Sequence, residues 1–350
     1  MTVSRYFLIV DHSESAEAAA QVLRTVGQRV DAANSAEIAC ERIAVLDEHR
    51  DDLVVIVDAD LLDGALDLSR VLASRQNTIV MLALNDVAND RRAASQRFVV
   101  GKPYDDSLLD QTEEVVCHLT MNRLLVHVVS ILMMQTDSPG AWSAAGSGCL
   151  VQLPERAVIL TAAHVVEHMQ HEGTKTYIGG NGTPVDISSW PVLGIDKVVD
   201  IATIGTPEGF DPQVIQGRFY VPSKWPPTRA QPGNAVIMVG FPSAHRIQVG
   251  GMRITHGALF SDFVSSSSMR QFVTAPKDMD RKVSSMTERL DSIDATGGMS
   301  GCPMFVGGQG EKPQLRGVLK EGGDGPNAVF FGAHSDFVRA DGTIDDSLMR

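Results

Sequence analysis

Short apolar runs alternate with amphipathic segments through roughly the first third of the chain. The runs have the length of buried strands, and they lie at residues 6–10, 53–58, 78–84 and 97–101. Segments with helical spacing of their apolar residues separate these runs, at 16–27, 35–49, 66–75 and 105–121. Apolar strands between helices favour a parallel sheet that is covered on both faces. We therefore expect residues 1–120 to form an α/β domain with a doubly wound parallel sheet.

The pattern changes after residue 120. The apolar run Leu124–Met134 is too short to span a bilayer and predicts the first strand of a second domain, so residues 121–145 are interpreted as a junction. The small and polar residues 135–148 predict an exposed loop. Residues 146–350 then contain short apolar segments that are separated by turns. Such spacing predicts an all-β antiparallel barrel or sandwich.

The stretch Asp294–Pro303 reads DATGGMSGCP and places Ser300 between turns of small residues. Glycines allow the backbone to turn so tightly that successive N–H groups point the same way. Such N–H groups can form an oxyanion hole, which stabilises the oxygen that becomes negative when an acyl carbon is attacked. Ser300 is therefore a candidate nucleophile, and the amides of Gly298 and Ser300 are candidate oxyanion donors.

A histidine and an aspartate precede this serine, each at the end of an apolar run. His164 lies in TAAHVV after the run AVIL, and Asp200 opens the run DIATIG. A serine hydroxyl needs a base to take its proton, and the base needs an acceptor that holds one tautomer. The order His, Asp, Ser meets both needs. Each residue alone also has a structural interpretation, as a core histidine, a turn acid like Asp196, or a turn serine.

TAAH, DIA and GMSGCP, in this order, resemble the motifs of the trypsin-like (chymotrypsin-like) serine peptidases. The resemblance implies an all-β double barrel and an endopeptidase with the triad His164, Asp200 and Ser300, which needs no cofactor. Met299 stands where many members carry an acid that pairs with a new N-terminus after zymogen cleavage, so the similarity is to the HtrA-like branch. Asp294 stands where trypsin-like members carry the acid that selects Lys or Arg, although HtrA-like members have an acid there without that role.

Acids lie at the carboxyl ends of the expected strands of the N-terminal domain, at Asp11, Asp58 and Asp60, where parallel sheets bind ligands. The pair Lys102–Pro103 follows the run RFVVG. In these residues the domain resembles the receiver domains of bacterial response regulators, which implies a receiver or flavodoxin-like fold. The resemblance implies that Asp58 is a phosphoacceptor, that Asp11 and Asp58 bind Mg²⁺, and that Lys102, in the pair Lys-Pro, contacts the phosphoryl group. A carboxylate can attack a phosphoryl donor when a metal and a lysine neutralise the charge.

Two residues depart from the receiver pattern. His12 stands where a second metal-binding acid is expected, and Ala83 stands where a Thr or Ser normally responds to the phosphoryl group. The loop after Asp58 is also short. Three interpretations therefore stay open: a receiver domain that is phosphorylated, a receiver-shaped docking or dimerisation module without phosphate chemistry, and an unrelated α/β domain.

Composition narrows the range of partners. The chain of 350 residues has a formal net charge of −13, which argues against nucleic acid and anionic membrane as partners. Its 43% hydrophobic and 21% charged residues are typical of a globular protein with a core. The N-terminus lacks the shape of a signal peptide, so a cytoplasmic protein is expected. The four cysteines are too sparse for a disulfide scaffold, and the peptidase resemblance predicts Cys149 and Cys302 as buried, reduced neighbours.

The sequence thus predicts a cytoplasmic bacterial serine endopeptidase that acts on a protein or peptide. We expect it to be regulated by, or docked through, the receiver-like domain, which would bind a regulatory protein or a second copy of the chain. The alternative is a non-catalytic signalling adaptor, in which both domains are protein-binding modules. Reaction with a serine-directed phosphonate distinguishes the two.

Overall fold

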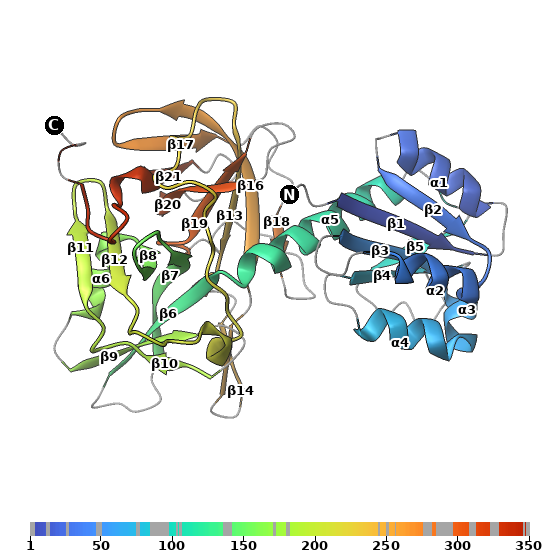
Figure 1. Cartoon of the computed structure of the whole chain (residues 1–350), viewed down its shortest axis with the longest axis horizontal. Coiled ribbons are helices and arrows are strands. Elements are labelled where there is room, and N and C mark those ends of the chain that lie inside the picture. The colour runs from blue at the N-terminus through green and yellow to red at the C-terminus, as the bar shows by residue number, and fades with distance from the viewer. Residues whose placement is uncertain are drawn as a thin grey trace. The chain divides into compact units, whose positions relative to one another are not determined.

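The computed structural model describes most of the chain in two compact units, Met1–Asn122 and Arg123–Arg350. The described residues are 4–11, 15–25, 28–46, 51–74, 78–84, 98–102, 104, 107–135, 142–170, 173–179, 183–243, 246–249, 252–255, 257–275, 282–284, 297–307, 313–322, 329–345 and 347. Figure 1 labels the elements of both units.

The first unit contains a parallel sheet with the strand order β2-β1-β3-β4-β5. Its strands are β1 (Ser4–Val10), β2 (Arg29–Ala33), β3 (Asp51–Asp58), β4 (Thr78–Leu84) and β5 (Val99–Gly101). Its helices are α1 (Ser15–Thr25), α2 (Ala36–Ala44), α3 (Ala59–Gly64), α4 (Leu66–Ser74) and α5 (Ser107–Leu125). No helix in the described ranges, here or later in the chain, is both long and apolar enough to cross a bilayer.

Helices cover both faces of this sheet. Alternate residues of a strand point to opposite faces, and they enter two separate clusters. Phe7 and Ile9 pack with residues of α1 and α5, whereas Leu8 and Val10 pack with residues of α2 and α4. The expected parallel sheet with helices on both faces is therefore present. Because both faces are buried, the central strands are continuous apolar runs without alternation.

The register of this sheet places its polar residues together. β1 and β3 pair in parallel with Val10 opposite Val57, so Asp11 and Asp58 follow at neighbouring strand ends. β4 pairs with β5 so that Leu84 lies opposite Gly101, the residue before Lys102. The carboxyl end of the sheet thus gathers the three residues that the sequence singled out.

The second unit consists mainly of antiparallel strands in two larger sheets. The first sheet has the order β10-β9-β6-β7-β8-β12-β11 and contains β6 (Val128–Gln135), β7 (Trp142–Gln152), β8 (Ala157–Thr161), β9 (Thr174–Gly179), β10 (Val185–Asp186), β11 (Val192–Asp196) and β12 (Ile201–Gly205). The second has the order β13-β19-β20-β21-β17-β16-β18 and contains β13 (Ala235–Gly240), β16 (Ala258–Ser267), β17 (Gln271–Ala275), β18 (Lys282–Ser284), β19 (Pro303–Gly307), β20 (Gln314–Gly322) and β21 (Phe330–His334). The described helical segments of this unit are α6 (Ala163–Met169), η2 (Pro212–Ile215) and η5 (Ser335–Phe337).

The second sheet closes into a barrel, because β13 pairs with β16 as well as with β19. Each sheet has its own apolar core, one around Ile131 and Ile159 and the other around Phe272 and Met304. A third cluster contains residues of both sheets, among them Val151 and Phe305. This shared cluster fixes the two sheets of the unit against each other.

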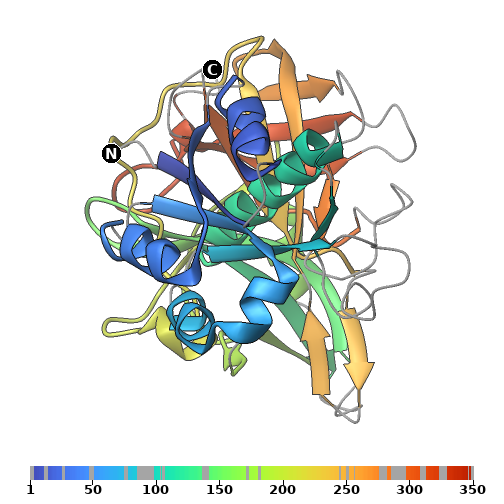
Figure 2. The same cartoon turned by 90° about the vertical axis from the view of Figure 1, so that its right-hand side faces the viewer.

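Several elements differ from the sequence prediction. The strand expected from Leu124 begins only at Val128, because α5 continues to Leu125. The prediction of a loop at residues 135–148 is wrong from Trp142 onward, since these residues open β7, and its small residues 146–148 are buried where another segment approaches. The short helix α3 and the two-stranded ribbon of β14 (Arg246–Val249) and β15 (Met252–Thr255), seen at the bottom of Figure 2, were not predicted.

Candidate active site

Antiparallel pairing brings the predicted histidine and aspartate together. β8 ends at Thr161, and α6 begins two residues later with His164 in its first turn. Asp200 directly precedes β12, which pairs with β8 so that Ala202 lies opposite Thr161. The end of one strand therefore meets the start of the other, and the two side chains converge there.

The carboxylate of Asp200 contacts His164 at two positions. The imidazole Nδ1 lies 2.9 Å from Oδ2 and 3.1 Å from Oδ1 of Asp200, and the backbone N–H of His164 donates to Oδ1 at 3.0 Å. Asp200 has a φ of 59°, a left-handed conformation that is uncommon outside glycine and occurs often at functional sites. A carboxylate on Nδ1 holds the proton at that nitrogen, so Nε2 keeps its lone pair for a base.

The electrostatics of this pair favour an imidazolium beside a carboxylate. The hydrogen bond to Asp200 raises the pKa of His164 against the opposing effect of burial, and the charges of Asp200, Glu167 and Glu321 raise it further. Burial acts to raise the pKa of Asp200, but hydrogen bonds from His164 outweigh it and the pKa lies below its usual value. The pair can therefore accept a proton on histidine and stabilise the charge that results.

Ser300 lines the same cavity as this pair. The cavity has a volume of about 410 Å³ and is lined by His164, Asp200, Gly297, Ser300, Lys320, Glu321 and Gly322. Ser300 Oγ donates to the carbonyl oxygen of Lys320 at 3.5 Å, and among the described residues no hydrogen bond joins it to His164. The register of β20 shifts between Leu319 and Glu321, so Lys320 is a bulged residue whose carbonyl is available to the serine.

The turn before the serine presents the two predicted oxyanion donors. Gly298 has a φ of 86°, a conformation that a glycine adopts without strain. The carbonyls of Gly298 and Ser300 accept hydrogen bonds from Ser147, through Oγ at 3.0 Å and through the backbone N–H at 2.8 Å. No described residue accepts a hydrogen bond from the N–H of Gly298 or of Ser300.

Other residues that the sequence singled out have structural positions. Asp196 is a turn acid, since its Oδ1 accepts from the N–H groups of Val198 and Val199. Cys149 and Cys302 are fully buried free cysteines, and burial raises the pKa of each thiol, with Cys302 adding to the effect at Cys149. That the two cysteines are near neighbours stays a prediction.

Asp294 and His12 lie outside the described residues, as does the proline that follows Lys102. The role of Asp294 in selecting Lys or Arg therefore stays a prediction. So does the loss of a metal-binding acid at His12. Met299 and Ala83 are described, and both are buried.

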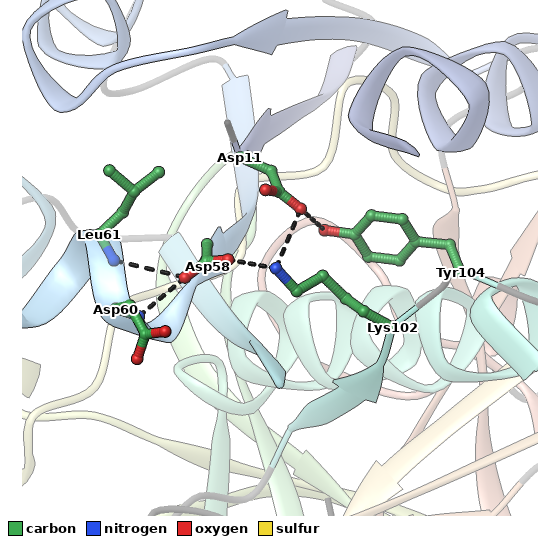
Figure 3. Close-up of polar contacts among 6 residues, drawn as sticks. All are labelled: Asp11, Asp58, Asp60, Leu61, Lys102 and Tyr104. Atoms are coloured by element: carbon green, nitrogen blue, oxygen red, sulfur yellow. Dashed lines mark hydrogen bonds and ion pairs between the residues drawn. The ribbon is translucent and has the colours of Figure 1, made fainter. Parts of the chain in front are cut away.

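A second polar cluster lies at the carboxyl end of the parallel sheet (Figure 3). Lys102 forms ion pairs with Asp58 and, at 3.3 Å, with Asp11, and all three side chains are nearly buried. The Tyr104 hydroxyl donates to the same Asp11 oxygen at 3.3 Å. Asp58 also caps α3, because its Oδ1 accepts from the N–H groups of Asp60 and Leu61. The structure therefore brings Asp11, Asp58 and Lys102 together.

The carboxylate oxygens of this cluster are the type of ligand that Mg²⁺ prefers. Mg²⁺ is often held by one or two carboxylates while it keeps several water molecules. Asp11 and Asp58 supply two carboxylates, although Lys102 contacts both and Tyr104 contacts the first. Among the described residues, no three or more His, Cys, Asp or Glu side chains converge as a metal site.

Three residues that contact the candidate site residues were not predicted from the sequence: Lys320, Tyr104 and Ser147. Lys320 contributes a backbone carbonyl, for which no side-chain pattern is diagnostic. Tyr104 lies two residues after Lys102, and an aromatic residue at that spacing could have been noted. Ser147 lies in a Gly-Ser-Gly stretch, whose small residues are the one signal of a close approach by another segment.

In comparisons with known proteins, no family model and no curated protein matches the chain. Among similar solved structures is one titled "Atomic resolution structure of HBP", which is 14% identical over 61% of this chain and 89% of that chain, with a TM-score of 0.38. At this TM-score the similarity supports no statement about fold or function.

Proposed function

We propose that the second unit is a trypsin-like serine endopeptidase domain. The observation that carries the proposal is the contact of His164 with Asp200 beside a cavity that Ser300 also lines. The closed barrel of the second sheet, with a further antiparallel sheet packed against it, supports the double barrel that the motifs imply. The proposed catalytic residues come from both sheets. His164 follows β8 and Asp200 precedes β12 in the first sheet, whereas Ser300 precedes β19 in the second.

In the proposed mechanism, Ser300 attacks the carbonyl carbon of a peptide bond. His164 Nε2 takes the hydroxyl proton as the C–O bond forms, and Asp200 stabilises the imidazolium. The N–H groups of Gly298 and Ser300 stabilise the oxyanion of the tetrahedral intermediate. His164 then gives the proton to the leaving amine, and an acyl-enzyme forms. Water then attacks the acyl carbon while His164 Nε2 takes a proton from it. The bond between the acyl carbon and Ser300 Oγ breaks, His164 returns the proton to Oγ, and the carboxylic acid is released.

One observation favours the adaptor alternative. Ser300 Oγ donates to the Lys320 carbonyl and not to His164 in the described structure, as a serine without catalytic use could. Hydrogen bonds between catalytic groups are often loose in the free enzyme and tighten when substrate binds. Because the contact to Lys320 is long, at 3.5 Å, a rotation of the serine side chain costs little. We therefore prefer the enzyme.

We propose a regulatory or docking role for the first unit as a receiver-like module of two-component signalling. The strand order 2-1-3-4-5 is that of flavodoxin-like sheets, which supports the receiver resemblance. Asp11 and Asp58 would hold Mg²⁺, which when bound supplies neutralisation of phosphoryl oxygens. Lys102 would contact the phosphoryl group of a modified Asp58. Its partner would be a regulatory protein or a second copy of the chain.

Hydrolysis of peptides by the Ser300→Ala variant tests the enzyme proposal. We expect kcat to fall about a million-fold in this variant, because His164 and Asp200 cannot act in catalysis without the serine nucleophile. Ser265→Ala is a matched control, since it removes an exposed hydroxyl of β16, and it should keep full activity. Full activity of Ser300→Ala would refute the mechanism.

A further inference from the structure

Two serines from other segments hold the carbonyl groups of the turn that precedes Ser300. The carbonyl of Gly297 accepts hydrogen bonds from both the backbone N–H and Oγ of Ser243, each at 2.6 Å. The carbonyl of Gly298 accepts from Oγ of Ser147 at 3.0 Å. Ser243 lies just after β13 and Ser147 lies within β7, so segments distant in sequence clamp this turn.

These contacts determine where the neighbouring N–H groups point. In a trans peptide the C=O and the following N–H point in opposite directions. A carbonyl of Gly297 that is held by Ser243 therefore directs the N–H of Gly298 to the other side of the peptide plane. The carbonyl of Met299 accepts from the N–H of Cys302 at 2.8 Å, which fixes the N–H of Ser300 in the same way. Both proposed oxyanion donors depend on carbonyls that other residues hold.

Ser147 is the more constrained of the two serines. It is fully buried, and its Oγ accepts from the N–H of Phe241 at 3.1 Å while it donates to Gly298. A side chain on the preceding residue, Gly146, would place a Cβ only 2.6 Å from the carbonyl oxygen of Ser300. The small residues of β7 thus allow the turn to approach closely, and the hydroxyl of Ser147 fills the hydrogen-bonding needs of two backbone groups.

We propose that Ser147 and Ser243 are positioning residues of the active site, which hold the Gly297–Ser300 turn so that its N–H groups face the reacting carbonyl. This inference rests on the proposed peptidase function. Neither serine touches the substrate. Each acts through the backbone of the turn, so its loss reduces stabilisation of the oxyanion more than it reduces binding of the substrate.

Ser130 provides a matched control for Ser147. It lies directly opposite Ser147 on β6 and is equally buried, but its hydroxyl has no hydrogen-bond partner among the described residues. Ser130→Ala and Ser147→Ala therefore remove the same atom at the same depth of one strand pair. Only Ser147→Ala also removes a hydrogen bond to the turn, the one to the carbonyl of Gly298.

The test compares steady-state peptide hydrolysis of the full chain with Ser130→Ala, Ser147→Ala and Ser243→Ala. We expect kcat to fall about 10- to 100-fold in Ser147→Ala with little change in KM, because the turn that carries both oxyanion donors loses its buried side-chain contact. In Ser243→Ala, kcat should fall only about threefold, since the backbone N–H of residue 243 still donates to the carbonyl of Gly297. Ser243→Thr, which keeps the hydroxyl at an exposed site, should restore the wild-type kcat. Ser130→Ala should match the wild type.

Hydrogen–deuterium exchange of residues 297–302 gives a second readout that does not need activity. Exchange should become faster in Ser147→Ala and Ser243→Ala but not in Ser130→Ala. An active wild type whose Ser147→Ala and Ser243→Ala variants keep its kcat overturns the positioning role and leaves the peptidase intact. If the wild type hydrolyses nothing, the proposed function fails. In that case unchanged exchange in both variants shows that the serines do not hold the turn, and faster exchange shows that they hold it without serving catalysis.

Discussion

The imidazole of His164 is the side chain whose charge should control activity. It acts as a base only when neutral, and its pKa lies above 6.5 because of its hydrogen bond to Asp200 and the charges of Asp200, Glu167 and Glu321. Protonation becomes more complete as pH falls, so the neutral fraction decreases through that pKa. Under the proposed mechanism, the rate should therefore fall at acidic pH as His164 becomes protonated.

We predict that kcat/KM falls on acidification with a midpoint above pH 6.5. Glu321→Gln removes an anion near the imidazole, so it should move the midpoint to lower pH. Glu155→Gln is a control, because Glu155 is an exposed acid with no described effect on His164. The measurement is a pH–rate profile of the free enzyme with a peptide substrate. A midpoint at or below 6.5, or a shift to higher pH in Glu321→Gln, would contradict this assignment.

The first helical turn of α3 depends on the carboxylate that ends β3. Asp58 accepts from the N–H groups of Asp60 and Leu61 and pairs with Lys102. Burial acts to raise the pKa of Asp58, but these contacts outweigh it, so the folded-state pKa is lowered. The stability that this charge contributes is present above the unfolded value of 3.8 and is lost as pH falls through the folded pKa.

We predict that Asp58→Ala lowers the free energy of unfolding by about 1–3 kcal/mol at neutral pH, through loss of the helix cap and of a nearly buried ion pair. Asp58→Asn keeps an acceptor for the cap and should lose less. Urea unfolding at neutral and acid pH measures both effects. The difference between wild type and Asp58→Asn should shrink on acidification, and a difference that grows would contradict the role of the charge.

Local patterns predicted most elements but not those that depend on distant partners. The apolar runs around Ile9 and Ile56 predicted strands, because burial on both faces leaves no polar position. The sequence predicts a loop at the start of β7, because its residues are small and polar. The structure buries the small residues near Ser147, because the distant serine turn packs on them. Chain order indicated His164 and Asp200, which are in contact, and Ser300, which lines the same cavity. The clamp by Ser147 joins residues 151 positions apart, and no local pattern contains such a contact.

At the scale of the whole molecule, the proposed peptidase domain shares its chain with the first unit, for which we propose a receiver-like role. A peptidase that is not activated by zymogen cleavage needs another restraint, and we propose the first unit as that restraint. Ala83 lies opposite Asp58 in the parallel register, and it carries no hydroxyl that a phosphoryl group could attract. We therefore expect control through a protein partner or self-association, which would shift the serine turn between arrangements.

We predict that a small phosphodonor with Mg²⁺ leaves peptide hydrolysis by the full chain unchanged, because the relay through position 83 is missing. Asp58→Ala should respond in the same way as the wild type. The measurement is the rate of hydrolysis with and without the phosphodonor, alongside sedimentation over a range of protein concentrations. Activation by the phosphodonor that disappears in Asp58→Ala would show that phosphorylation controls the enzyme.

Reaction of the full chain with a serine-directed phosphonate, followed by mass spectrometry, distinguishes the proposed peptidase from the adaptor. We expect one phosphonate per chain on Ser300, none in Ser300→Ala, and slow labelling in His164→Ala and in Asp200→Asn, whose amide holds the wrong tautomer. Asp196→Asn should label at the wild-type rate, because Asp196 caps a turn. Failure of the wild type to react, or labelling of another serine with Ser300 unmodified, would refute the proposed peptidase function and favour the adaptor.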